Sequence, residues 1–161
     1  MTYGFQRATE SDLPRLAAWR ARPHVRAWWD TDEPATPEEL DDPRVARWIV
    51  STGGRAFAYM QDYTVHGWAD HPFFDLPQGS RGIDQFIGEP EMTGRGHGPA
   101  FIATRLRALF TAGAPVIATD PHPDNARAIS AYRKAGFAPV GPTQNTPWGP
   151  ILPMRIDRPH L

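Results

Sequence analysis

The sequence predicts an α/β (α+β) fold with a mixed central sheet of about seven strands and helices on both faces. Two observations support this fold class. Seven segments have the short apolar or alternating pattern of β-strands, and two of the later ones are followed by amphipathic helices. In addition, a chain of 161 residues of which 40% are hydrophobic has the size of one domain. We therefore expect a single domain over residues 1–161.

The first half of the chain is expected to contain a strand, two helical pieces and a β-hairpin. Thr9-Glu-Ser-Asp12 supplies side-chain oxygens of the kind that cap a helix start. Gly53 and Gly54 permit the positive φ angles of a tight hairpin turn. The expected elements are strand 3–7, helix 13–20, helix 24–29, a loop or single turn over 30–43, and strands 45–51 and 56–65.

The second half is expected to contain two strand-turn-helix units and two final strands. The loop over 66–80 is rich in aromatic residues, so we expect it to pack against the protein and to wall a pocket. The expected elements are strand 81–88, a helix that opens at 93–98, strand 114–119, helix 124–135 closed by Gly136, and strands 137–144 and 151–157 paired around Pro147-Trp-Gly-Pro150.

The composition argues against several classes of function. A net charge of -1 gives no basic field that would attract nucleic acid or an anionic membrane. No run of about 18 apolar residues and no charged-then-apolar leader is present, which predicts a cytoplasmic protein. The chain has no cysteine, and its six histidines show no His-Glu-x-x-His spacing, so we expect no metal. The sequence leaves monomer and homodimer open.

The acidic residues are concentrated in two segments. Of the eighteen acids, thirteen lie within residues 30–42 and 62–91, where Arg81 is the only lysine or arginine. If the fold brings both segments to one side, they form a negative rim that attracts a cationic ligand. The alternative is a pair of solvated acidic loops.

A glycine-rich turn, Thr93-Gly-Arg-Gly-His-Gly98, lies where a strand leads into a helix. Its alternate glycines let backbone N–H groups point into one concavity at a helix N-terminus, which suits a pyrophosphate. Arg95 and His97 could add charge to bound phosphates, whereas Pro99 removes one N–H donor. The spacing fits neither the Walker pattern nor the dinucleotide fingerprint. The alternative is an ordinary flexible turn.

The later helix carries two polar side chains on nearly one face. Asn125 and Tyr132 are seven residues apart, which corresponds to two helical turns. On this face Asn125 could bond the amide arm of a cofactor, and Tyr132 could donate a proton to a thiolate leaving group. The alternative is a capping residue and a half-buried aromatic with its hydroxyl in water.

Three motifs carry a resemblance to a known family: Thr93-Gly-Arg-Gly-His-Gly98, Thr119-Asp-Pro-His-Pro-Asp-Asn125 and Ala128-Ile-Ser-Ala-Tyr-Arg-Lys-Ala-Gly-Phe137. They resemble the acetyl-CoA-binding core of the GNAT acetyltransferases. Four further segments resemble the aminoglycoside 6′-N-acetyltransferases in particular: Arg22-Pro-His-Val-Arg-Ala-Trp-Trp29, Tyr59-Met-Gln-Asp-Tyr63, Arg81-Gly-Ile-Asp-Gln85 and Thr146-Pro-Trp-Gly-Pro150. The resemblance implies a GNAT fold, a single acetyltransferase domain and acetyl-CoA as cosubstrate.

The resemblance also implies roles for individual residues. Asp84 is expected to act as the base for the substrate amine, and Tyr132 to protonate the departing thiolate. A backbone N–H near Ile87 or Gly88 would meet the thioester oxygen. The residues expected to bind the cofactor are Thr93, Gly94, Arg95, Gly96, His97, Gly98, Ile87 and Asn125. The residues expected to bind a cationic amine substrate are Trp29, Trp68, Asp70 and Asp120.

The implied reaction is attack of a neutral amine on a thioester carbonyl. Without a cysteine or a Ser-His-Asp pattern, direct transfer in a ternary complex fits better than a covalent intermediate. One alternative is a GNAT acyltransferase for another acceptor, such as a siderophore hydroxylamine or a protein N-terminus. Another is a non-catalytic acyl-CoA-binding sensor. The acidic rim favours a polycationic acceptor, and a sensor has no need of both Asp84 and Tyr132.

Overall fold

The structure is a computed structural model that describes residues 2–29 and 35–159. Its strands are β1 (Tyr3–Arg7), β2 (Val45–Thr52), β3 (Arg55–Thr64), β4 (Arg81–Ile87), β5 (Val116–Thr119), β6 (Ala138–Pro139), β7 (Gln144–Thr146), β8 (Gly149–Ile151) and β9 (Met154–Asp157). Its α-helices are α1 (Leu13–Ala21), α2 (Pro23–Arg26), α3 (Pro37–Leu40), α4 (His97–Thr111) and α5 (Ala126–Ala135). Short 3-10 turns cover Glu10–Asp12, Val65–Gly67 and Pro90–Met92.

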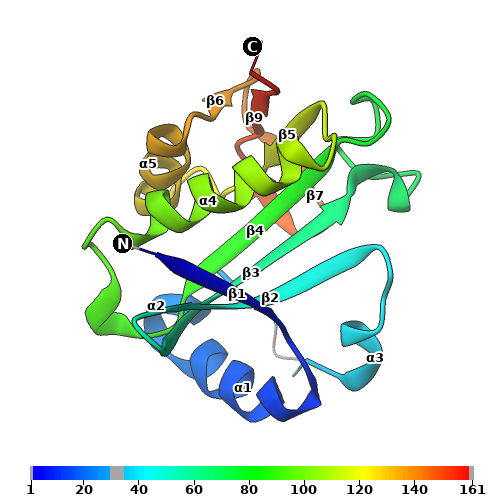
Figure 1. The fold of residues 1–161 in the computed structure, drawn as a ribbon. Coiled ribbons are helices and arrows are strands. Elements are labelled where there is room, and N and C mark those ends of the chain that lie inside the picture. The colour runs from blue at the N-terminus through cyan, green and yellow to red at the C-terminus, as the bar shows by residue number, and fades with distance from the viewer. Residues whose placement is uncertain (1, 30–34, 160–161) are drawn as a thin grey trace. The chain divides into compact units, whose positions relative to one another are not determined.

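Seven strands form one mixed sheet in the order β1-β2-β3-β4-β5-β9-β6, and β7 pairs with β8 in a separate two-stranded sheet (Figure 1). The expected fold class is confirmed by this sheet. By its internal contacts the chain divides into two compact units. The first unit comprises Met1–Asp62 and Gln85–Gly98, and the second comprises Tyr63–Asp84 and Pro99–Leu161.

In the first unit, β1 and β2 pair antiparallel with Tyr3 opposite Thr52. The expected cap precedes α1, because the Thr9 N–H donates to Asp12 Oδ2 at 2.9 Å. The turn between β2 and β3 has φ angles of 57° and 78° at its two glycines, as the sequence predicts. One core cluster draws apolar side chains from α1, α2, β2, β3 and β4: Leu16, Trp19, Val25, Ile49, Tyr59 and Phe86.

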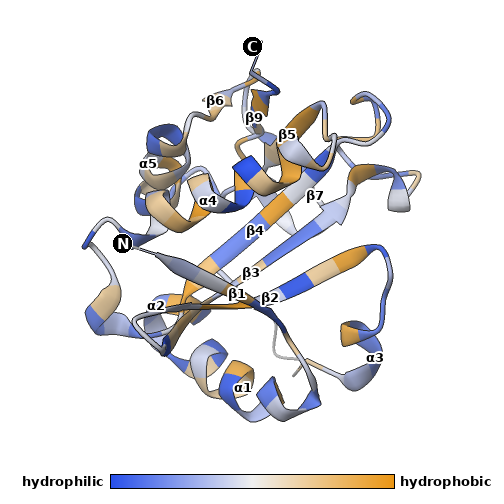
Figure 2. Ribbon diagram, viewed as in Figure 1, coloured by the Kyte–Doolittle hydropathy of each residue, from blue (hydrophilic) through white to orange (hydrophobic). Residues whose placement is uncertain are grey.

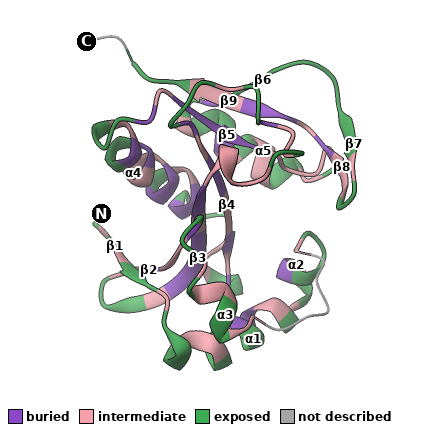
Figure 3. Ribbon diagram, turned by 90° about the vertical axis from the view of Figure 1, so that its right-hand side faces the viewer, coloured by how far each residue is buried: buried purple, intermediate pink, exposed green. Residues whose placement is uncertain are grey.

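In the second unit, β4 and β5 pair parallel, and β9 lies antiparallel to β5 on its other edge. All four residues of β5 are buried, as expected of a central strand. Hydrophobic and hydrophilic residues alternate along α4 (Figure 2), and its buried residues form a stripe (Figure 3). The buried residues of this helix include Phe101, Ile102, Leu106 and Leu109. Helix α5 ends at Gly136, whose φ of 113° is left-handed, as predicted.

The C-terminal strands differ from the sequence prediction. A single strand was expected over 137–144, but β6 has only two residues, although it does pair with β9. The chain then forms the β7–β8 hairpin, in which Thr146 lies opposite Gly149. Prolines at 139 and 142 and the positive φ of Gly141 explain why a long ladder does not form.

Over residues 2–29 and 35–159, no helix is long and apolar enough to cross a membrane. Over the same ranges, no three His, Cys, Asp or Glu side chains gather where they could hold a metal ion.

Candidate functional site

Two carboxylates meet at the carboxyl ends of β4 and β5 in the second unit. Arg81 lies opposite Ile117 and Gly82 opposite Ala118, and the same register continued by two residues places Asp84 opposite Asp120. The Thr119 hydroxyl donates to the Ile83 carbonyl at 3.0 Å and supports this register. The Asp84 and Asp120 side chains are hydrogen-bonded to each other. The two acids that the sequence analysis singled out are therefore neighbours.

The two carboxyl groups influence each other's protonation. Burial raises the pKa of Asp120 well above its ordinary value, and the charge of Asp84 and the hydrogen bond with it raise that pKa further. Hydrogen bonds from Trp148 and with the backbone act in the opposite direction. The raised pKa favours the protonated form of Asp120, in which its hydroxyl can donate to Asp84.

Tyr63 is buried beside the carboxylate pair. Burial raises the pKa of its phenol well above the ordinary value, and the nearby Asp84, Asp120 and Tyr132 raise that pKa further. Its ring lies directly over Gly82, where a side-chain carbon would overlap the ring. Gly82 is therefore required for close packing, because the ring occupies the space that a Cβ would need.

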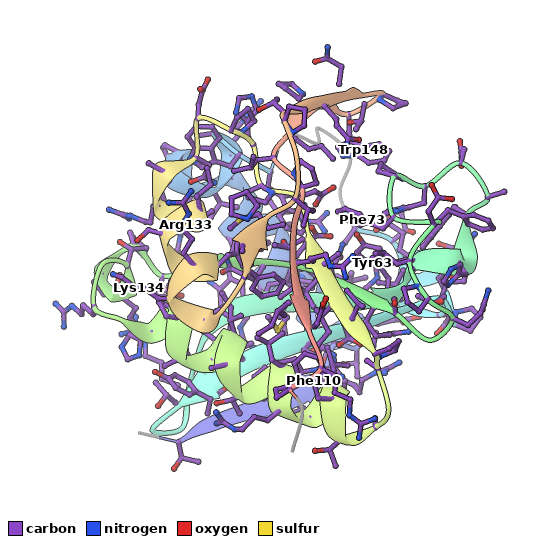
Figure 4. The ribbon with its side chains drawn as sticks, turned by 90° about the horizontal axis from the view of Figure 1, so that it is seen from above. Tyr63, Phe73, Phe110, Arg133, Lys134 and Trp148 are labelled. Atoms are coloured by element: carbon purple, nitrogen blue, oxygen red, sulfur yellow. The ribbon has the colours of Figure 1, made fainter. Side chains whose placement is uncertain are left out.

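Four aromatic rings surround His71, and with it they form what we call the aromatic cluster. The ring centroid of His71 lies 5.3 Å from that of Tyr63, 5.5 Å from Phe73, 6.1 Å from Trp68 and 6.1 Å from Trp148. Figure 4 shows Tyr63, Phe73 and Trp148 on the same side of the view. Trp148 also reaches the carboxylate pair through its hydrogen bond with Asp120.

The imidazole of His71 is neutral at pH 7. Its Nδ1 accepts a hydrogen bond from the Phe73 N–H at 3.1 Å. Burial lowers the pKa of His71, and the charge of Asp70 opposes that effect only in part. Two predicted substrate residues, Trp68 and Asp70, thus lie against this histidine.

The loop over 66–80 walls a cavity of about 270 Å³, as predicted. The loop contributes Pro72, Phe73, Asp75 and Leu76, and the remaining lining residues are Ala118, Val140, Gln144, Pro153 and Arg155. Through Ala118 the cavity touches β5, the strand that Asp120 follows directly.

The two polar residues of α5 have different settings. Tyr132 is 4% exposed, and its ring packs edge-on against Phe137 at 5.5 Å. The sequence alternative of a half-exposed tyrosine is therefore wrong. Asn125 caps the helix, since its Oδ1 accepts from the Ala128 N–H at 3.2 Å. Because the cap uses the side-chain oxygen of Asn125, its amide nitrogen is the group that could donate a hydrogen bond to a cofactor.

The glycine-rich turn belongs to the first unit and leads into α4. Gly94 and Gly96 have φ angles of 71° and 83°, and a side-chain carbon on either would meet nothing within 4 Å. Left-handed residues that precede a helix N-terminus aim backbone N–H groups outward, and α4 has 15 residues. Arg95 is exposed beside them. These features fit a pyrophosphate.

Two details of the predicted cofactor site need correction. The His97 side chain is 8% exposed, and its Nδ1 is hydrogen-bonded to the Tyr3 hydroxyl at 2.9 Å, so its ring packs inward and is not directed at phosphates. The N–H of Gly88 donates to the Phe57 carbonyl at 2.8 Å, so it is not available for a thioester oxygen. The Ile87 N–H remains as the candidate donor.

Trp29 lies at the edge of the first unit's core. Its ring packs edge-on against Phe86 at 5.1 Å and against Tyr59 at 5.7 Å. The ring of Trp29 is only partly buried. Its role in substrate binding stays a prediction.

The predicted negative rim is smaller than the acid count suggests. Asp62 is 1% exposed and accepts from the Trp48 indole at 2.8 Å, so it faces the interior. Other acids form ion pairs within the first unit: Glu89 with Arg22, Glu91 with Arg55, and Asp42 with Arg44. Paired acids add little to a long-range field. Asp30, Asp32 and Glu33 lie outside the described residues.

Three residues of the site were not among the sequence-predicted candidates. Tyr63 lies inside a motif that carries the family resemblance, but no periodicity marks it as a neighbour of Asp84. His71 lies in a loop and Trp148 in a hairpin turn, where no periodicity marks either side chain as part of a site. Only the β4–β5 register and the β7–β8 hairpin bring these side chains to the carboxylate pair.

Comparison with known proteins identifies the family. Residues 8–144 match the Acetyltransferase (GNAT) domain. The aminoglycoside N(6′)-acetyltransferase type 1 of Klebsiella pneumoniae is 34% identical over 158 residues, which cover 91% of this chain and 78% of that protein.

Two solved structures are similar over nearly the whole chain. AAC(6′)-Ib in complex with paromomycin and acetyl-CoA has a TM-score of 0.87 at 32% identity, covering 98% of this chain and 94% of that one. AAC(6′)-Ib in complex with coenzyme A and kanamycin has a TM-score of 0.86 at 32% identity, covering 98% and 95%. The chain therefore belongs to the GNAT acetyltransferase family.

Proposed function

We propose that this chain, as a single acetyltransferase domain, transfers the acetyl group of acetyl-CoA directly to the 6′-amine of an aminoglycoside. The observation that carries the proposal is the Asp84–Asp120 pair beside the aromatic cluster. A buried carboxylate pair among aromatic rings attracts a protonated amine and favours its partial desolvation. The substrate class is supported by the relatives named for aminoglycoside acetylation and by the complexes with paromomycin and kanamycin.

Asp84 acts as the base, directly or through one water. A protonated amine has no lone pair, so it must lose a proton before it can attack the thioester carbon. The C–N bond then forms while the C–S bond breaks, and the sulfur takes the phenol proton of Tyr132. Of the two protons that the nitrogen loses, one leaves through Asp84 and the other restores the Tyr132 phenol. Asp120 keeps its own proton and holds Asp84 in place.

The cofactor would be held by main-chain N–H groups together with two side chains. The N–H groups of the Thr93–Gly98 turn would bind the pyrophosphate of CoA, and Arg95 would add charge. The Asn125 amide nitrogen would donate to a carbonyl of the pantetheine arm, and the Ile87 N–H would meet the thioester oxygen. When bound, acetyl-CoA supplies the activated acyl group.

The test is release of the CoA thiol from acetyl-CoA in the presence of kanamycin. We expect turnover in the parent and a loss of at least about 100-fold in kcat in Asp84→Asn, because a base contributes on this order. Asp124→Asn is the matched control: its carboxylate is 83% exposed in the same unit, and turnover should be unchanged. No turnover on kanamycin or related aminoglycosides despite acetyl-CoA binding would refute the proposal.

A further inference from the structure

We propose that Trp148 positions the acceptor for this reaction, with its indole N–H holding the Asp120 carboxyl while its exposed face receives a sugar ring of the amine substrate. The inference rests on the proposed function and extends it to the substrate's shape. The acceptor would be an amine carried next to a ring, and not a linear amine.

The backbone around Trp148 is rigidly held. Trp148 occupies the turn of the β7–β8 hairpin, between Thr146 and Gly149, which pair across the two strands. The Thr146 hydroxyl donates to the Gly149 carbonyl at 2.6 Å, and Gly149 has a φ of 112°. The base of the hairpin is tied to the end of β5, because the Leu152 N–H donates to the Pro121 carbonyl at 2.8 Å. This bond lies one residue from Asp120.

The Trp148 ring has two partners and is still more than half exposed. Its N–H binds the Asp120 carboxyl. The His71 ring lies 6.1 Å away at an interplanar angle of 35°, and the Phe73 N–H bond in turn orients His71. Even so, Trp148 is 58% exposed, the most exposed of the large hydrophobic residues that the structure describes. A tryptophan whose N–H is already bound and whose ring is more than half exposed offers an aromatic contact surface to a ligand.

The chemistry of the surroundings selects the ligand. A carboxylate pair and an adjacent indole face fit a molecule that has a cationic amine beside an apolar C–H face. A hexose ring with an aminomethyl substituent has both features. A linear amine can satisfy the carboxylates but leaves the indole face in water.

The two parts of the role can be separated by substitution. Trp148→Phe keeps an aromatic face and removes the N–H, whereas Trp148→Ala removes both. Phe74→Ala is the control, because Phe74 is a 41% exposed aromatic of the same unit whose ring contacts His66 instead of the aromatic cluster.

The test measures KM for kanamycin, KM for acetyl-CoA, the pH profile of kcat/KM, and kanamycin binding by calorimetry. In Trp148→Ala we expect the kanamycin KM to rise at least about fivefold with the acetyl-CoA KM unchanged. In Trp148→Phe the rise should stay under about threefold, and the acidic limb of the profile should move to higher pH because Asp120 loses a hydrogen-bond donor. Phe74→Ala should match the parent.

Two results would overturn the inference: a kanamycin KM in Trp148→Ala equal to that of the parent, or an equal rise in both KM values. If the parent binds kanamycin without acetylating it, the proposed function fails by itself. The inference is then decided by calorimetry, where Trp148→Ala must weaken kanamycin binding at least about fivefold and Phe74→Ala must not.

Discussion

Substitution of Gly82 by alanine should disturb both the stability of the protein and the carboxylate pair. A methyl group at this position would stand 2.5 Å from Cε2 of Tyr63 and closer still to Cζ, whereas carbon atoms in contact stay about 3.5–4.0 Å apart. The overlap is about 1 Å or more, and Tyr63 is only 5% exposed, so its ring has little room to move. Overpacking of this size costs about 2–3 kcal/mol.

For a chain of this length, that cost corresponds to a fall in Tm of roughly 5–10 °C. Calorimetry or circular dichroism would measure this fall in Tm. A lower kcat/KM on kanamycin would show that the carboxylate pair has been displaced. Gly4→Ala is the matched control, because Gly4 also lies in a strand and a side-chain carbon there meets nothing within 4 Å. The double variant Gly82→Ala/Tyr63→Leu should regain stability. A Gly82→Ala protein that melts with the parent would refute the reasoning.

Three further predictions concern titration, packing and charge. The folded-state pKa of Asp120 is raised above 3.8, so the parent loses stability as the pH rises from 3.8 through the folded-state pKa. Asp120→Asn cannot lose this proton, so its stability relative to the parent should increase between pH 5 and pH 8. Urea denaturation that shows the same difference at both pH values would contradict this. Gly88→Ala should lower the free energy of unfolding by about 1–3 kcal/mol, since a methyl there would lie 2.6 Å from Cε2 of Trp19; unchanged urea unfolding would argue against it. The KM for a polycationic aminoglycoside should rise from low salt to about 0.5 M salt as screening increases, and a salt-independent KM would indicate an uncharged acceptor.

Local pattern was sufficient to predict most of the fold. The amphipathic periodicity of α4, the Gly53-Gly54 turn and the left-handed Gly136 each act within a few residues, so the sequence reveals them. The turn at Pro147-Trp-Gly-Pro150 was predicted correctly, but the extent of the strands before it was not, because prolines break that segment into pieces too short to show alternation.

The site was only partly predictable because its contacts join distant segments. Asp84 and Asp120 were identified from the family resemblance, but the hydrogen bond between them follows from the β4–β5 register. His97 belongs to the predicted phosphate turn, yet its ring turns inward because Tyr3, 94 residues earlier, offers a hydroxyl partner. No local pattern marks such a partner, and the same holds for Trp148.

The most direct test of the account is the structure of the product formed from kanamycin and acetyl-CoA. Mass spectrometry and NMR should show one added acetyl group, on the 6′-nitrogen, and an analogue with a hydroxyl in place of the 6′-amine should not be acetylated. Asp84→Asn should form little of this product. Acetylation at another nitrogen, or an equal yield from the hydroxyl analogue, would contradict the central claim.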